Sequence, residues 1–162
     1  MLASGVILGV VAGLALRRTW RPLAETRIRW LPVLIGALLI RAVASFVGEL
    51  GYVLYVSALT GTAVAAAVNY RLPGAVLVSV GGWLNLAVVV LNHGMPVDPM
   101  ALSAIGAQMP RDSLHVVLDQ STRLGWIADI IPLGIARSVY SAGDVLIAIG
   151  GFLVPFSLFT RR

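Results

Sequence analysis

Hydrophobic residues fall in five long runs, which short polar segments and one long mixed segment separate. The runs cover residues 1–16, 30–48, 52–69, 75–91 and 143–159. A helix needs roughly 20 apolar residues to cross the hydrocarbon core of a bilayer, and these runs approach that length. The pattern predicts an all-α polytopic membrane protein, with about five transmembrane helices in a single integral membrane domain over residues 1–162.

The mixed segment, residues 92–142, is too long for a structureless loop and too apolar to extend freely into water. We expect it to form an interfacial helical segment on the outer face of the membrane. Asp112 or Ser113 is suited to cap a short amphipathic helix there. On that helix His115, Asp119 and Arg123 would recur every four residues along one face.

Composition supports the membrane assignment. The chain is 59% hydrophobic and 12% charged, with a mean hydropathy of +0.93, so it has too little polar surface to cover a soluble globule of this length. It contains no cysteine, which excludes disulfides and thiol nucleophiles, and its two histidines argue against a multi-histidine metal site. We therefore expect neither a metal nor a cofactor.

The net charge of +5 comes from arginine alone, because the chain has no lysine. Most arginines lie just beyond the apolar runs: Arg17, Arg18, Arg21, Arg27, Arg29, Arg71, Arg161 and Arg162. This placement follows the positive-inside rule and differs from the basic stripe of a nucleic-acid-binding protein. It predicts a multi-pass protein of the bacterial cytoplasmic (plasma) membrane, with the N-terminus outside and the C-terminus cytoplasmic. We expect membrane lipid as a partner, and we do not expect the protein to bind nucleic acid.

Glycines in the first run recur every four residues, at Gly5, Gly9 and Gly13. Such a repeat gives a helix a flat face that another helix can approach closely. Packing within the chain is the first interpretation, and a contact in a homo-oligomer or a larger complex is the alternative.

Two polar side chains interrupt the apolar runs. Arg41 lies roughly 18 Å along the second run, counted from Arg29 at about 1.5 Å per residue. A guanidinium at that depth needs a partner or water, and Glu49 lies too far along the same helix. We expect the partner to come from another helix or from the outer segment. Asn85, about a dozen residues beyond its own inner turn, should lie at a similar depth.

Two carboxylates stand in contrasting surroundings. Asp129 has no polar neighbour within residues 126–132, which predicts a raised pKa or a fixed partner. Asp144 opens the last run, where the backbone N–H groups and the helix dipole favour its charged form. An aspartate dyad of this kind would suit acid and base roles. In the alternative interpretation Asp144 is a helix cap, and Asp129 pairs with Arg41 or Arg137.

A turn signal with glycine and proline follows the fourth run, at residues 92–98. His93 lacks the second histidine that a metal site requires. We expect Asn92 and His93 to hydrogen-bond loop backbone at the membrane surface or to contact a polar group of a ligand, with Asp98 beside them.

Two resemblances arise at these residues. From the glycine-rich first run, through residues 92–98, to residues 141–146, the chain resembles an uncharacterised bacterial family of multi-pass membrane proteins, domain of unknown function family 5317. That resemblance implies no activity.

The C-terminal half, at residues 81–85, 126–129 and 144, is similar to signal peptidase II, a lipoprotein-processing aspartyl protease. This resemblance implies Asp129 and Asp144 as catalytic residues, with Asp98 as an alternative to Asp129. The chain departs from that family's pattern by an extra N-terminal run, a longer outer segment and the lack of Asp-Arg after Asn85.

Three functions follow from these patterns. The favoured one is a membrane protein with an outer-facing polar pocket for a small, lipid-like or lipidated ligand. Its candidate residues are Arg41, Asn85, Asn92, His93, Asp98, Asp129 and Asp144. The second is an intramembrane aspartyl hydrolase that uses Asp129 and Asp144. The third is a structural partner subunit of a membrane complex.

Overall fold

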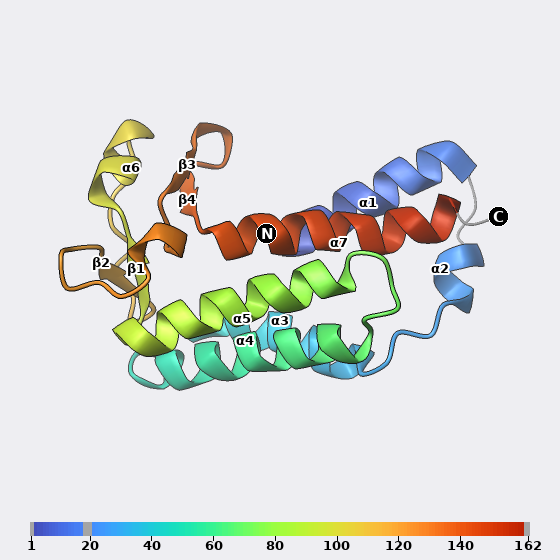
Figure 1. Ribbon diagram of the computed structural model, residues 1–162, viewed down its shortest axis with the longest axis horizontal. Helices are drawn as coiled ribbons and strands as arrows, with labels where there is room; N and C mark the ends of the chain where they lie inside the picture. The colour runs from blue at the N-terminus through green and yellow to red at the C-terminus, as the bar shows by residue number, and fades with distance from the viewer. Residues whose placement is uncertain (1, 18–20, 161–162) are drawn as a thin grey trace.

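Long helices that run along a common direction give the molecule its elongated shape (Figure 1). The computed structural model describes residues 2–17 and 21–160, so Arg18, Arg161 and Arg162 of the expected basic side lie outside the described residues. The long helices are α1 (Leu2–Arg17), α3 (Leu31–Ala44), α4 (Leu50–Val68), α5 (Ala75–Asn92) and α7 (Ala142–Thr160). Each of the five apolar runs is therefore helical over most of its length.

The helices differ in length. Among the described residues, α4, α5 and α7 are long and apolar enough to cross a membrane. The helices α1 and α3 are apolar but have only 16 and 14 residues. The second run was expected to be helical to residue 48, but α3 ends at Ala44, and the chain turns through Gly48, which has a φ of +58°. The structure thus supports three membrane-crossing helices and does not confirm the predicted five.

The long helices pack as a series, α1 against α7, α7 against α5, α5 against α4 and α4 against α3. Figure 1 shows α5 between α7 and α4. The glycine repeat of α1 faces α7. A Cβ atom added at Gly9 would lie 2.8 Å from Cγ of Pro155 and closer still to the carbonyl oxygen of Phe152. The repeat therefore serves packing within the chain, as the first interpretation held.

A second close approach joins α5 to the start of α7. A Cβ atom on Gly143 would lie 2.7 Å from the carbonyl oxygen of Gly81, and it would overlap Oδ1 of Asn85. The absence of side chains at Gly81 and Gly143 thus brings the two backbones together. It also lets the amide of Asn85 reach the first turn of α7.

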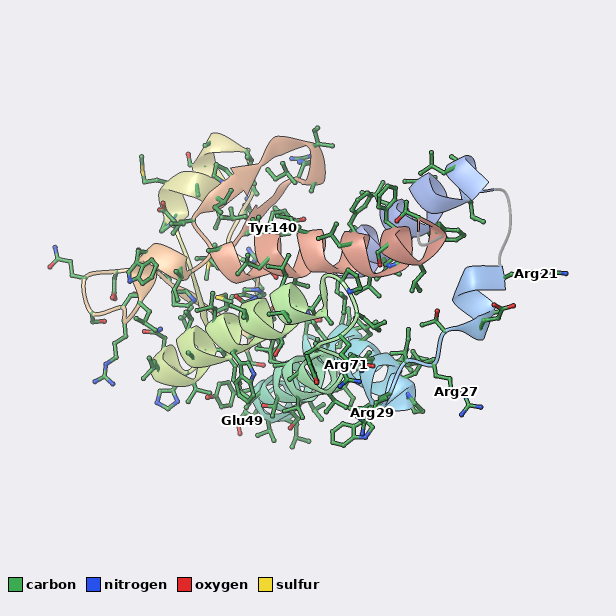
Figure 2. All side chains as sticks on the ribbon, turned by 45° about the vertical axis from the view of Figure 1, so that its right-hand side comes forward. Arg21, Arg27, Arg29, Glu49, Arg71 and Tyr140 are labelled. Carbon is green, nitrogen blue, oxygen red and sulfur yellow. The ribbon has the colours of Figure 1, made fainter. Side chains whose placement is uncertain are left out.

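The basic residues gather at one end of the helices. Figure 2 shows Arg21, Arg27, Arg29 and Arg71 toward this end and Glu49 toward the other. The short helix α2 (Arg21–Glu25) belongs to the basic end. Asn69, the last residue before the turn to α5, holds the chain there, because its side chain accepts from Arg29 N at 2.9 Å and donates to Arg29 O at 2.7 Å.

The opposite end carries the long segment between α5 and α7, which folds on the ends of the helices (Figure 1). It contains β1 (Met95–Val97), α6 (Pro99–Ala104), β2 (His115–Val117), the 3₁₀ turn η1 (Gly125–Ile127), β3 (Ile131–Leu133), the 3₁₀ turn η2 (Gly134–Ala136) and β4 (Ser138–Tyr140). Strands β1 and β2 pair in parallel, and β3 and β4 pair antiparallel. The chain is mostly helical, and the all-α prediction is wrong for these short strands.

The amphipathic helix predicted around residues 113–123 is also wrong. Asp112 does accept from the N–H groups of Leu114 and His115, at 3.0 and 3.2 Å, as a cap would. However, the Leu114 carbonyl accepts from Met95 N at 2.7 Å, so this backbone pairs with a distant strand and not with its own next turn. The β-branched Val116 and Val117 favour an extended backbone as well.

We expect Gly9→Ala to lower the melting temperature of the protein in detergent, because the added methyl group would overlap the α7 backbone. Gly36 of α3 is the matched control, since a Cβ atom there meets nothing within 4 Å. Gly36→Ala should be neutral or should stabilise the protein by up to about 1 kcal/mol through helix propensity. Equal melting temperatures for the two variants would contradict the α1–α7 packing.

Candidate functional site

A polar cavity of about 440 Å³ opens where the helices meet the segment that follows α5. Apolar side chains of α1, α3, α4 and α7 form much of its wall, including Leu2, Leu38, Leu59 and Ile147. Its polar lining comes from α3 and the residue that follows it, from α4, α5 and α7, and from the stretch that leads into β2: Arg41, Ser45, Thr62, Asn85, Asp112, His115 and Asp144. Three residues that the sequence singled out, Arg41, Asn85 and Asp144, thus line one cavity.

Arg41 meets an aromatic ring and no acid. Its guanidinium carbon lies 4.6 Å from the ring centroid of Tyr55 on α4, a cation–π arrangement. The described residues place no carboxylate within 4.0 Å of the guanidinium. The partner expected from another helix is therefore the aromatic ring of Tyr55, and Arg41 forms no ion pair with a described residue.

A hydrogen-bonded network joins α5 to the first turn of α7. Ser141, which is fully buried, donates from Oγ to Asn85 Oδ1 at 2.8 Å. Asn85 Nδ2 donates to Asp144 Oδ1 at 3.3 Å. Ser141 also caps α7, because its Oγ accepts from Asp144 N at 2.9 Å, while Asp144 Oδ2 accepts from Ser141 N at 3.4 Å. Asp144 is therefore a capping residue and also part of the cavity wall.

Asp129 lies behind the cavity and is not among its lining residues. Its side chain is 7% exposed. Within the described chain its Oδ1 atom has no hydrogen-bond partner. Its pKa is raised to about 8, mainly by burial and in addition by the nearby charge of Asp144, while Arg41 opposes the shift. The carboxyl of Asp129 is therefore largely protonated at neutral pH, as its apolar sequence surroundings predicted.

The backbone of Asp129 is held against β1. Its N–H donates to the Pro96 carbonyl at 3.0 Å, and its carbonyl accepts from Asp98 N at 2.9 Å. The side chain of Asp98 is used locally, as it accepts from Met100 N at 2.8 Å and caps α6. Of the two aspartates considered as the neighbour of Asp144, Asp129 is the one whose pKa the charge of Asp144 raises.

Asn92 and His93 do not line the cavity. Asn92 Nδ2 donates to the Arg123 carbonyl at 2.9 Å, and Asn92 Oδ1 accepts from Arg123 N at 2.8 Å. His93 ends α5 in a left-handed conformation, with its ring centroid 6.2 Å from that of Tyr52. Asn92 thus hydrogen-bonds loop backbone, which is one of the two roles expected of it.

The site also contains residues that the sequence patterns did not indicate. His115 and Asp112 both line the cavity and contact each other, with Nδ1 and Oδ1 2.8 Å apart. No local pattern indicated this contact or the role of Tyr55. Ser141 could have been found, because serine three residues before an acidic residue at a helix start is a capping signal.

A second hollow continues from the polar cavity toward the basic end. It has a volume of about 370 Å³, lies mainly between α1 and α3, and has a wholly apolar surface. Leu2, Ala3 and Leu38 line both hollows. A polar chamber thus adjoins an apolar groove.

The comparisons with known proteins place the chain in a family. A family model described as "Family of unknown function (DUF5317)" matches residues 25–156. The chain belongs to this family. No curated protein and no solved structure matches it, so the likeness to signal peptidase II is not shown. Since the family description carries no activity, the function has to be argued from the site.

The site offers charge and hydrogen bonding, and its described residues form no metal cluster. No group of three or more His, Asp or Glu side chains in residues 2–17 and 21–160 is close enough to hold a metal ion. The cavity instead presents a guanidinium on one wall and a hydrogen-bonded carboxylate on another. Such a pair can bind and orient a polar group in an otherwise apolar setting.

The raised pKa of Asp129 predicts a pH dependence of stability. Between about pH 4 and pH 8 the folded chain holds a proton on Asp129 that the unfolded chain releases. The free energy of unfolding should therefore fall as the pH rises through this range, by up to several kcal/mol at about 1.4 kcal/mol per pKa unit. Asp129→Asn should remove this fall in denaturant titrations in detergent.

Asp119 provides the control for this measurement. It is exposed, and hydrogen bonds from Ser121 lower its pKa, so it stays ionised between pH 5 and pH 8 in both states. Asp119→Asn should keep the wild-type slope in that range. If Asp129→Asn kept that slope too, the protonated state of Asp129 would be ruled out.

Proposed function

We propose that this protein is an integral membrane protein that binds an amphiphilic molecule at its outer face. The polar cavity would take the headgroup, and the groove between α1 and α3 would take a hydrocarbon chain. One observation carries the proposal: Leu2, Ala3 and Leu38 line both hollows, so a polar chamber and an apolar groove form adjoining parts of one site. A lipid has both a polar headgroup and an apolar chain, so it can fill a polar chamber and the apolar groove that adjoins it, whereas a small polar molecule would fill only the chamber.

The proposed membrane placement has all five long helices crossing the bilayer, with the N-terminus outside and the C-terminus in the cytoplasm. The arginines at one end of the bundle support this orientation, because they match the positive-inside rule (Figure 2). The helices α1 and α3 are short for a full crossing, with 16 and 14 residues. Local thinning of the bilayer accommodates helices of this length at modest cost.

The headgroup, and not the chain, would supply the selectivity. A hydrocarbon chain that moves from the bilayer into an apolar groove exchanges one apolar setting for another, so it gains little from the hydrophobic effect. A polar headgroup gains more, because hydrogen bonds to charged side chains are stronger than those between neutral groups. Arg41 and Asp144 are the charged residues of α3 and α7 that line the cavity.

The hydrolase alternative has less support. The proximity of two carboxyl groups in different surroundings favours it, since acid and base roles need different pKa values. Both groups would also have to reach one water molecule beside the substrate. Asp129 does not line the cavity, whereas Asp144 does.

Blocking the junction of the two hollows tests the binding proposal. We expect Leu38→Trp to reduce the amount of phospholipid that stays bound through purification in mild detergent, because the larger ring would fill the passage beside Leu2 and Ala3. Native mass spectrometry counts the bound lipids. Leu39→Trp is the matched control, since Leu39 is 63% exposed and lines neither hollow. Equal lipid retention in both variants would contradict the proposal.

Cysteine labelling tests the orientation, and the natural chain contains no cysteine to interfere. Ser121→Cys, in the exposed loop before η1, should react with a membrane-impermeant maleimide added to intact cells. Ala24→Cys, on the exposed surface of α2, should react only after the cells are permeabilised. The reverse labelling pattern would contradict the proposed topology, but it would not contradict the proposed binding site.

A further inference from the structure

Two opposite charges face the same cavity without pairing with each other. Arg41 and Asp144 both line it, yet within residues 2–17 and 21–160 no carboxylate lies within 4.0 Å of the guanidinium and no cationic side chain lies within 4.0 Å of the Asp144 carboxylate. Opposite charges in apolar surroundings attract strongly. The cavity beside them is therefore suited to a molecule that contacts both.

Arg41 is suited to bind an anion. Its guanidinium carbon lies 4.6 Å from the ring centroid of Tyr55, and no salt bridge with a described residue uses its N–H groups. A guanidinium has five N–H donors and binds phosphate or carboxylate through two of them at once. The contact with Tyr55 restrains the side chain and so favours such two-point binding.

Asp144 is suited to bind a cation that carries N–H groups. Among the described residues the donors to its carboxylate are neutral, Asn85 Nδ2 at 3.3 Å and Ser141 N at 3.4 Å. A carboxylate has about four acceptor sites, so capacity remains for a charged donor. A quaternary ammonium fits less well, because aromatic faces bind such groups and Arg41 covers the Tyr55 ring.

We infer that the bound amphiphile carries a zwitterionic headgroup, with a phosphate or carboxylate on Arg41 and a primary ammonium on Asp144. A phospholipid with a phosphoethanolamine headgroup has this chemistry. The inference rests on the proposed amphiphile site and names the class of molecule that occupies it.

The test compares lipids with identical acyl chains on the wild-type protein in detergent, with dissociation constants from native mass spectrometry. Phosphatidylethanolamine should bind at least about tenfold more tightly than phosphatidylcholine, which lacks ammonium N–H donors, or phosphatidylglycerol, which lacks the cation. Glycerophosphoethanolamine, which has the headgroup without the chains, shows whether the headgroup alone is sufficient. The inference expects it to bind more weakly than the full lipid.

Two variants assign the charges. Asp144→Asn keeps the size of the side chain and one acceptor oxygen but removes the charge that holds the ammonium, so it should reduce the preference for phosphatidylethanolamine over phosphatidylglycerol to about twofold or less. Arg41→Gln should weaken both lipids alike. Asp119→Asn and Arg123→Gln are the matched controls, because both residues are exposed and lie outside the cavity lining, and they should leave the preference unchanged.

The outcomes distinguish failure of the inferred headgroup from failure of the proposed amphiphile site. If the wild-type protein binds phosphatidylglycerol or phosphatidylcholine as tightly as phosphatidylethanolamine, the inferred headgroup with a phosphate and a primary ammonium is wrong and the amphiphile site stands. If none of the three lipids binds saturably, the proposed function itself fails. If glycerophosphoethanolamine binds as tightly as the full lipid, the headgroup chemistry is correct and the role of the apolar groove is wrong.

Discussion

The hydrogen-bonded network of Asn85, Ser141 and Asp144 is the interaction on which the site depends. Polar groups among apolar helices are costly unless they are satisfied. Here three side chains satisfy one another where α5 meets α7. The contact exists only because Gly81 and Gly143 let the two backbones approach so closely. The same network starts α7 and places the Asp144 carboxylate on the cavity wall.

Arg41 contributes the second charged group of the cavity lining. It comes from α3, at the far end of the helix series α1, α7, α5, α4, α3, and Tyr55 of α4 supports its guanidinium. The ends of that series, α1 and α3, line the apolar groove. The packing order of the helices therefore determines both the separation of the two charges and the position of the groove that adjoins them.

The sequence was informative wherever the signal was a long apolar run or a polar residue within one. The runs located five helices, and counting residues along them placed Arg41 and Asn85 at a common depth, where they line one cavity. Apolar neighbours correctly predicted the raised pKa of Asp129. Run length was less informative, because α3 ends at Ala44 and not near residue 48.

Structure that depends on distant partners could not be predicted in this way. The residues from His115 to Arg123 have a helical spacing of polar groups, but the Leu114 carbonyl accepts a hydrogen bond from Met95 N, which lies nearly twenty residues earlier in the chain. Asn92 was expected either to hydrogen-bond loop backbone or to contact a ligand, and Asp98 was a ligand-binding candidate; the side chains of both bind backbone groups. Short polar side chains in turns serve local capping so often that sequence alone does not separate this use from binding.

A crystal structure of the protein grown from a lipid phase tests the central claim most directly. We expect elongated density in the groove between α1 and α3, with its polar end between the Arg41 guanidinium and the Asp144 carboxylate. A direct ion pair between Arg41 and Asp144 that closes an empty cavity would contradict the claim.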